Sequence, residues 1–455
     1  MMKVLLLCVL SMSISQAFCQ QDSLLRNFKF RISKFRALSF GLGGGANYNN
    51  TDYPAGVSEN SNGGGAIGIG YFTTKSTDRI LSTQSSSLNS NYSQGKGTTN
   101  VAPNKFKNFS AASGIRTLNK WFSKNKFIEL GADGYGSSSR GEYNTKNAPE
   151  ISRQNYDEYS IALNTGIGIG RLENITDMQN ALWLNKALEK SNSLDRPLSA
   201  AELHELGRSI TKANNTRVLD SRKRIQFALE TVDSFFQKNN LLSKADIKYF
   251  SNLNDILFFA FNNYRLSGTE KFIRLTPVIS DYRNDNSQNN TAQKFEERAL
   301  IKSLNFSVGI NKHVPLNLAH QNNFGAALQL NYIEQDYSNR FFTSGTITNE
   351  LKNSATRKQA ALDLFFEHAI YPNTRTAVNI RMQTLSGIEE LEKNTEFFGS
   401  ARVNGDFNYF ISYRTRLNFG LGAFYQHNTR EQYRYMGLLP NTLQLFVNAG
   451  ISVNM

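Results

Sequence analysis

The segment Leu443-Gln-Leu-Phe-Val-Asn-Ala-Gly-Ile-Ser-Val-Asn-Met455 stands at the end of the sequence and decides the fold. Every second residue from Leu443 to Met455 is apolar, and alternate residues of an extended chain share one face. A run of 13 such residues is longer than a globular strand of about 5 or 6, whereas a tilted membrane strand of about 9 to 11 residues accommodates it. The segment therefore predicts a β-strand that crosses a membrane.

The same alternation recurs along most of the chain. Residues 397–411 and 417–425 both alternate, and the short connector 412–415 joins them into a hairpin. Counting such segments gives about 14 strands, and because the pattern is weakest at the second and third of them, 12 or 16 strands stay open. Their approximate centres are residues 37, 68, 86, 111, 132, 162, 277, 303, 325, 362, 380, 403, 422 and 449.

Connections between the predicted strands are short and long in turn. Tight turns are expected near residues 119–125, 312–315, 371–374 and 412–415, and longer polar stretches cover 48–62, 139–154, 281–293 and 337–354. Short turns on one side and long loops on the other are typical of bacterial outer-membrane barrels. We therefore expect an all-β transmembrane antiparallel barrel. An even strand number places both termini on the tight-turn, periplasmic side.

The N-terminus has the layout of a secretory signal peptide. Lys3 precedes a mostly apolar run over residues 4–14, and Ser15-Gln-Ala-Phe-Cys19 follows. Cleavage after Cys19 would export the chain toward the outer membrane of a Gram-negative bacterium; the alternative is a lipoprotein acylated at Cys19. Because both cysteines, Cys8 and Cys19, fall in this segment, cleavage leaves no cysteine for a disulfide or a thiolate metal site.

The composition agrees with a membrane barrel but does not decide it. The chain holds 32 Phe and 19 Tyr against 2 Trp, together with 32 Gly, yet its mean hydropathy is −0.44. A barrel needs apolar residues only at alternate positions, which reconciles many aromatics with a hydrophilic average. A secreted β-sandwich shares this composition, so the periodicity carries the prediction.

Residues 171–270 interrupt the strands with a period near 3.6, which predicts a small helical domain. Capping boxes at Thr176-Asp-Met-Gln179 and Ser199-Ala-Ala-Glu202 open two helices, a third covers about 216–238, and a fourth follows residues 243–246. By strand parity this insert lies in the periplasm; the alternative is a plug inside the lumen. The expected division is a signal peptide (1–19), a first half-barrel (20–170), the insert (171–270) and a second half-barrel (271–455).

The fourth predicted helix is apolar beyond a single stripe. Phe258 and Phe259 flank that stripe, so they are candidate contacts with the barrel rim or with a periplasmic protein partner. The alternative is that this helix is the central one of its own bundle.

A short motif stands where the sixth strand meets the insert, in Gly166-Ile-Gly-Ile-Gly170-Arg171-Leu-Glu173-Asn-Ile-Thr176-Asp177. It resembles Bacteroidota-type outer-membrane barrel proteins, in which a glycine-alternating strand runs through a Gly-Arg-x-Glu-x-x-Thr-Asp element into a helical insert. The resemblance implies location and architecture and no activity. Strict alternation puts the three glycines on one strand face, where they relieve crowding, and it argues against a dinucleotide-binding loop.

The sequence offers no enzyme motif. None of the five histidines pairs with another at zinc-ligand spacing, and none accompanies a nucleophile motif. His427 is the one histidine placed near an outer rim, as in outer-membrane hydrolases, but its strand phase puts it on the lipid side. We predict no catalytic residue, no metal and no cofactor, and an outer-membrane enzyme is the least favoured function.

The net charge of +14 belongs mainly to the barrel, because residues 171–270 hold 14 basic and 12 acidic side chains. An outer-membrane address argues against nucleic acid and favours lipids and lipopolysaccharide as partners of the loop cations. A basic lumen would favour anions, although arginine–carboxylate pairs also stitch barrel interiors together. The candidate lumen-lining residues are Asp363, Glu367, Arg381, Arg402, Asp406 and Arg416.

A barrel with a helical insert is compatible with two functions. The first is an outer-membrane anchor that presents its helical domain to a periplasmic partner. The second is a porin-like channel for small solutes, with anions as a candidate class, since a barrel of about 14 strands falls between packed 8-stranded and open 16-stranded barrels. The sequence does not set the oligomeric state.

Overall fold

The computed structural model describes residues 20–53, 56–99, 102–145, 151–216, 220–259, 265–288, 293–391, 394–411, 415–428 and 441–453. The predicted signal peptide, with Cys8 and Cys19, lies outside these residues. The strands are β1 (Ile32–Tyr53), β2 (Gly56–Ser76), β3 (Ile80–Thr99), β4 (Ala102–Ser123), β5 (Lys126–Thr145), β6 (Ile151–Asn174), β7 (Leu266–Gln288), β8 (Gln293–Pro315), β9 (His320–Thr343), β10 (Thr346–Asn373), β11 (Thr376–Leu391), β12 (Asn394–Phe410), β13 (Thr415–Asn428) and β14 (Asn441–Val453).

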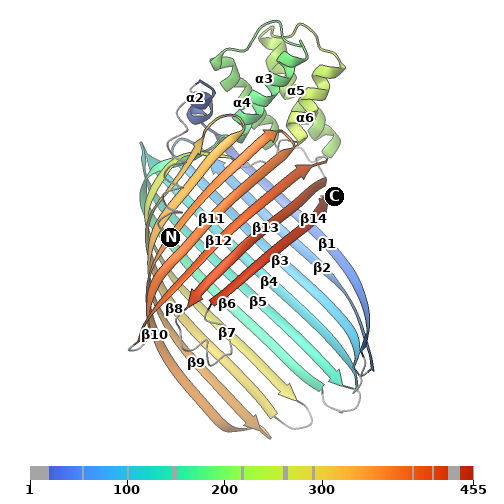
Figure 1. Ribbon diagram of the computed structural model, residues 1–455, viewed down its shortest axis with the longest axis vertical. Coiled ribbons are helices and arrows are strands. Elements are labelled where there is room, and N and C mark those ends of the chain that lie inside the picture. The colour runs from blue at the N-terminus through green and yellow to red at the C-terminus, as the bar shows by residue number, and fades with distance from the viewer. Residues whose placement is uncertain are drawn as a thin grey trace.

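These strands form one antiparallel sheet in which each pairs with the next along the chain, from β1 to β14. Every predicted strand centre falls inside a strand, so the count of 14 is confirmed. The sheet curves strongly (Figure 1). Between the described residues of β14 and β1 there is no hydrogen-bonded pairing, so the sheet is open at this edge.

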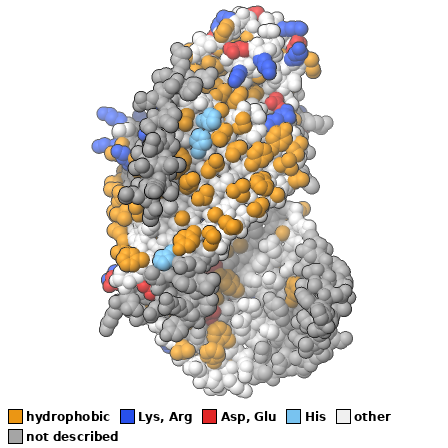
Figure 2. Space-filling view, viewed as in Figure 1, with side chains coloured by type: hydrophobic (Ala, Val, Ile, Leu, Met, Phe, Trp, Pro, Cys, Tyr) orange, Lys and Arg blue, Asp and Glu red, His pale blue; other side chains and the backbone are white. Residues whose placement is uncertain are grey.

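One face of the sheet carries an apolar row that is exposed along the strands. On β14, Leu443, Leu445, Val447 and Ile451 are all exposed, and the equivalent alternate residues of the other strands continue the row. Figure 2 shows these hydrophobic side chains spread over the outer face of the wall. The opposite face holds mostly polar, charged and glycine residues. The period-two pattern of the sequence is therefore the division between these two faces.

The strands are longer than predicted, and the expected long polar loops are largely strand. Residues 337–354 form the ends of β9 and β10, whose pairing runs to Thr343 and Thr346 across a two-residue turn. Residues 48–62, 139–154 and 281–293 likewise belong mainly to β1 and β2, β5 and β6, and β7 and β8. These outer segments are mostly polar, and their few apolar residues do not alternate, as the adjacent Phe341 and Phe342 show, so they lack the pattern that predicts the other strands. Their backbone groups nevertheless pair across the hairpins.

Glycines on the inner face accept aromatic rings from the neighbouring strand. Gly168 pairs with Phe127, and a Cβ added at Gly168 would lie 2.3 Å from Cζ of that ring. Gly309 and Phe272 repeat the arrangement, with the added Cβ 2.6 Å from Phe272 Cζ. The prediction that the alternating glycines relieve crowding in the wall is thus confirmed at Gly168.

The described helices gather at one end of the sheet (Figure 1). They are α2 (Gln20–Asn27), which precedes β1, and α3 (Thr176–Lys190), α4 (Ala200–Asn215), α5 (Ser221–Lys238) and α6 (Ile247–Phe259), which lie between β6 and β7. We call these five helices and residues 28–30 the helical unit. No helix among the described residues is long and apolar enough to cross a membrane.

The helical unit has its own apolar core, which includes a part of the chain that we had assigned to the first half-barrel. Leu25 and Phe28 are fully buried against this core, although they precede β1. Leu318, from the turn between β8 and β9, is also buried in it. Strand structure continues to Asn174 and resumes at Leu266, so the helical segment is shorter than residues 171–270.

Of the two predicted capping boxes, the structure confirms one and contradicts the other. Ser199 and Glu202 form the expected capping box of α4. At α3 the prediction is wrong, because the N-cap is Ile175 and the Thr176 hydroxyl accepts the Arg265 N–H instead, at 2.9 Å. The Asn174 side chain accepts the Thr176 N–H in its place, at 2.9 Å.

Candidate functional site

A charged layer crosses the inner face of the sheet near its helical end. It consists of Lys120 on β4, Glu129 on β5, and Glu270 and Arg274 on β7. The Lys120 Nζ lies 2.7 Å from Glu270 Oε1 and 3.3 Å from Glu129 Oε2. Arg274 donates to Glu129 at 2.9 Å and to Glu270 at 3.2 Å. Three strands are thus tied together by ion pairs whose Lys120 and glutamate side chains are buried.

The charged layer satisfies its own charges. Two cations face two carboxylates, and each cation also lies over an aromatic ring: Lys120 over Phe127 at 4.8 Å and Arg274 over Phe272 at 3.9 Å. Breaking a buried ion pair leaves an uncompensated charge, which costs several kcal/mol. This arrangement stabilises the strand register and leaves no charge in the layer free for a ligand.

A second ionic cluster lies at the rim, where the N-terminal segment enters β1. Arg31 donates to Glu173 at 2.8 Å and to Asp78, in the β2–β3 turn, at 2.8 Å. Arg171 lies beside them, with its Nε 3.1 Å from Glu173. The hydrogen bond from Arg31 lowers the pKa of the Asp78 carboxyl. The Gly-Arg-x-Glu element of the sequence therefore holds the β6 end to the start of β1.

Arg265 joins the helical unit to the β8–β9 turn. Its side chain is fully buried, and its guanidinium donates to the carbonyl oxygens of Asn317, Leu318 and His320 at 2.6 to 2.8 Å. Its Nε donates to the Gln321 side chain at 2.7 Å. Every one of these acceptors belongs to residues 317–321, so one arginine fixes that turn against α3 and α6.

A further joint links α6 to the β10–β11 turn. Asp255 accepts the Arg375 Nε at 3.0 Å and the Thr374 hydroxyl at 3.2 Å. With Arg265 and the Arg31–Glu173 pair, this makes three polar joints between the helical end of the sheet and the helices or their flanking segments. The helical unit is therefore held at the rim at several points, and Figure 1 places it beyond the strand ends and not between the strands.

The six predicted lumen-lining residues lie on the face opposite the exposed apolar row. Glu367 and Arg381 are paired in register between β10 and β11. Glu367 accepts the Asn323 amide at 2.7 Å, whereas Arg381 lies over the Phe365 ring at 4.8 Å. Asp363 accepts the Gln383 amide at 3.0 Å.

The remaining three predicted lumen residues sit nearer the open edge. Arg402 lies over the Phe424 ring at 5.3 Å and Arg416 over the Phe410 ring at 6.0 Å, while Asp406 is exposed. In the described part of the chain, none of the six forms an ion pair. The buried ion pairs lie instead in the charged layer. Strand phase did not predict them, because the β7 residues Glu270 and Arg274 are distant in sequence from their partners on β4 and β5.

The predicted partner contacts on α6 are placed differently. Phe258 packs against the core of the helical unit, and the side chain of Phe259 lies outside the described residues. Near the start of α6, Ile247 is 82% exposed and Phe250 is also exposed. Apolar surface does face solvent on this helix, but at the end away from the rim.

A buried carboxyl lies between α3 and α4. Asp177 accepts the Thr211 hydroxyl at 2.7 Å and the Asn214 amide at 3.0 Å. Burial raises the pKa of Asp177 to about 6, and these two hydrogen bonds oppose the rise. The carboxyl is enclosed by α3 and α4 and bonds only to residues of α4 in these contacts, so its protonation affects the stability of the helical unit.

The histidines are dispersed. His320 and His368 lie on the outer face with ring nitrogens 3.3 Å apart, and His368 also contacts the Asn322 side chain at 2.7 Å. His204 stacks on Phe28 inside the helical unit. Across the described residues, no group of three or more His, Cys, Asp or Glu side chains is arranged to hold a metal ion.

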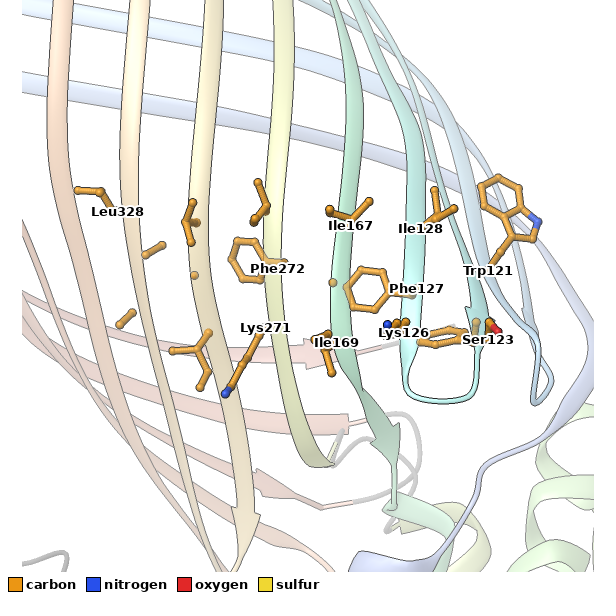
Figure 3. Close-up of a pocket in the computed structure, with 18 of the residues that line it drawn as sticks. Trp121, Ser123, Lys126, Phe127, Ile128, Ile167, Ile169, Lys271, Phe272 and Leu328 are labelled. Carbon is orange, nitrogen blue, oxygen red and sulfur yellow. The ribbon is translucent and has the colours of Figure 1, made fainter.

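An apolar depression of about 1030 Å³ runs across the wall from β4 to β10 (Figure 3). Trp121, Ile128, Ile167, Ile273 and Leu328 from the exposed row line it, with Lys126 and Lys271 among its few polar groups. Gly168 and Gly309 also line it, together with the rings of Phe127 and Phe272. It is a feature of the apolar face and holds no reactive group.

No protein-family model matches the chain, and no curated protein matches it. Among solved structures, the translocator domain of autotransporter NalP from Neisseria meningitidis is 10% identical, covering 90% of this chain and 95% of that one with a TM-score of 0.26. The Ralstonia pickettii toluene transporter TbuX is 8% identical, covering 95% and 94%, with a TM-score of 0.31. Likenesses this low carry no argument about this chain.

Proposed function

We propose that the chain is an outer-membrane β-barrel that anchors the helical unit on the periplasmic side of the membrane. The observation that carries this proposal is the exposed apolar row, which continues from β1 to β14 on one face only. Exposed side chains such as Leu42, Ile161 and Val447 would be unfavourable in water and are favourable against lipid. Closure of β14 onto β1 completes the barrel, because lipid cannot satisfy an unpaired strand edge.

The helical unit suits presentation to a partner because it is held rigidly. Arg265, Asp255 and the Arg31–Glu173 pair fix it to strand ends and turns, and its core stays separate from the sheet interior. The exposed apolar side chains of Ile247 and Phe250 point to a contact surface on α6. Because Phe258 packs against the core of the helical unit, we propose this surface in its place as the site of partner contact.

Cysteine labelling tests the orientation directly, since the only native cysteines are Cys8 and Cys19. Asn353→Cys lies on β10 away from the helices, and Lys248→Cys lies on α6; both positions are exposed. On intact cells, a membrane-impermeant maleimide should label the β10 cysteine alone. The α6 cysteine should react only after the outer membrane is permeabilised. Labelling of the α6 cysteine on intact cells would overturn the periplasmic placement.

Closure is testable with paired cysteines on the two edge strands. Leu38 on β1 and Leu445, Val447 or Ala449 on β14 all point outward or lie on the outer row. In a closed barrel, one of the three β14 positions paired with Leu38→Cys should form a disulfide that changes migration on a denaturing gel. The absence of any cross-link across a full scan of β14 would contradict closure.

A channel for small solutes is the second candidate function, and one observation favours it. Arg116, on the inner face of β4, is 75% exposed although it pairs with Asp133, so the interior at this height is not filled by side chains. Conductance across a planar bilayer separates the two functions. Ohmic, anion-selective current from the purified protein would support the channel, and a silent bilayer would support the anchor.

A further inference from the structure

A basic cleft of about 560 Å³ lies between the helical unit and the rim of the sheet. Helix α4 forms one wall, the segment entering β1 forms another, and the β2–β3 turn closes a side. We call this site the basic cleft, after its charged lining residues Lys29, Arg31, Lys34, Asp78, Arg208 and Lys212.

The cleft carries an uncompensated positive charge. Five of its side chains are cationic and one is a carboxylate, which leaves a net charge of +4. Arg31 is already neutralised by Asp78 and Glu173. The other four cations, Lys29, Lys34, Arg208 and Lys212, are exposed and form no ion pair with any described residue.

The uncharged polar groups of the cleft are used inside α4. The Thr211 hydroxyl donates to Asp177, the Asn215 amide to the Thr211 carbonyl, and the Thr216 hydroxyl to the Lys212 carbonyl. The last two of these bonds hold the Thr211 and Lys212 carbonyls near the C-terminal end of α4, and the first joins α4 to α3, so these uncharged side chains are already engaged. Recognition in the cleft therefore depends on the four free cations.

We propose that the basic cleft binds a phosphate-bearing anion between Arg208 and Lys212 of α4 and Lys29 and Lys34 of the entering segment. Arginine and lysine on facing walls match a group whose charge is spread over several oxygens. The anion site itself does not depend on membrane placement. Its supply by the headgroup of an anionic phospholipid, in preference to free phosphate, rests on the proposed function, because the cleft lies where the strands end.

Binding is measured on the full mature chain in non-ionic micelles at low ionic strength. The probes are dihexanoyl phosphatidylglycerol, dihexanoyl phosphatidylcholine and inorganic phosphate, followed by isothermal titration calorimetry. The test variant is R208Q/K212Q, which removes two free charges from one wall. The matched control is R224Q/K238Q, which removes one exposed arginine and one exposed lysine from α5, outside the cleft.

Phosphatidylglycerol should bind the wild type and the α5 control with dissociation constants that agree within twofold. The R208Q/K212Q variant should bind about 30-fold more weakly, at about fivefold for each cation near the site. A second variant, K29Q/K34Q, should show a similar loss from the opposite wall, which keeps the test valid if α4 tolerates its changes poorly. Raising the salt concentration should shrink these differences.

The three probes separate the sources of the anion. Phosphatidylglycerol bound far more tightly than inorganic phosphate indicates a lipid headgroup, and equal affinities indicate free phosphate; both outcomes support the site. The proposed anion site would be overturned if the wild type bound phosphatidylglycerol no more tightly than phosphatidylcholine, and if R208Q/K212Q bound both lipids as the wild type does. Phosphate binding by a chain that fails the maleimide test would keep the site and refute only the membrane placement.

Discussion

Replacing Arg265 by leucine should release the helical unit from the β8–β9 turn. Leucine occupies part of the buried volume but donates no hydrogen bond. The carbonyl oxygens of Asn317, Leu318 and His320 and the Gln321 side chain would lose the donors that now lie 2.6 to 2.8 Å away. Because the arginine is fully buried, water cannot replace all of these donors without opening the joint.

The size of the effect follows from the unpaired groups. A buried polar group left without a partner costs about 1 to 3 kcal/mol. The two acceptors of Nη2 are only partly buried, so water can serve them after small movements. The two remaining acceptors, Gln321 and the Leu318 carbonyl, are buried, so the expected loss is about 2 to 6 kcal/mol. At about 1.4 kcal/mol for each factor of ten, the joint should open roughly thirtyfold to twenty-thousandfold more often.

Amide hydrogen exchange, followed by mass spectrometry in micelles, measures this opening. Arg265→Leu should speed exchange in α3 and α6 by at least about thirtyfold while central strands such as β4 and β5 keep their protection. Arg265→Lys should fall between, since an ammonium offers three donors. Arg196→Leu is the control, because Arg196 forms an exposed pair with Glu202, and exposed ion pairs contribute little to stability. Unchanged protection of α3 and α6 in the leucine variant would refute the role assigned to this joint.

Three other perturbations probe the remaining features. Burial raises the pKa of Asp177 from its ordinary value of 3.8 to about 6, so the folded helical unit binds the proton more tightly than the unfolded chain, and its stability should fall by about 3 kcal/mol as pH rises from about 3 to about 7. In urea titrations at several pH values, Asp177→Asn should abolish this dependence of stability on pH. An equal pH dependence in the variant and the wild type would contradict the role of Asp177. Gly168→Ala should destabilise the sheet by about 1 to 3 kcal/mol, since the new Cβ would lie 2.3 Å from the Phe127 ring and from a backbone oxygen. Gly134→Ala is the control, because nothing lies within 4 Å of its added Cβ, and equal urea midpoints for the two variants would show that the ring is not fixed there. Asp255→Ala should speed exchange in α6 about twofold to fivefold and spare α3, as expected for a partly exposed ion pair; an equal rise in both helices would mean that the joint holds the whole unit.

The strands could be predicted because their pattern has a single physical cause. One face of the sheet carries exposed apolar side chains and the other carries mostly polar ones, so residue type alternates along each strand, as in Leu443 to Ile451. Where apolar residues are sparse, as over residues 343–354 with only Ile347 and Leu351, the pattern carries too little signal, and the sequence predicts a loop where the structure has strand. Helix α2 has only eight residues, too few for a helical period to show, and its segment docks through the buried Leu25 and Phe28 with Leu24 and Phe30 packed beside them.

The polar contacts could not be predicted, because each depends on residues that meet only after folding. Thr176 has the sequence of a helix cap, yet its hydroxyl binds the N–H of Arg265, 89 residues later. Lys120 and Glu270 are 150 residues apart, and their contact follows from the curvature that brings β4 toward β7 across β5 and β6. Strand phase shows which side chains share a face, but it does not show which of them touch.

The two ionic features at the helical end differ in how their charges are compensated, and this difference separates structure from binding. In the charged layer, Lys120 and Arg274 are matched by two glutamates within the same buried cluster, so an external anion would have to displace a carboxylate. In the basic cleft, Arg208 and Lys212 face Lys29 and Lys34, and repulsion between like charges remains until an anion arrives. The same chemistry of lysine and arginine therefore stabilises the sheet in one place and creates a site in the other.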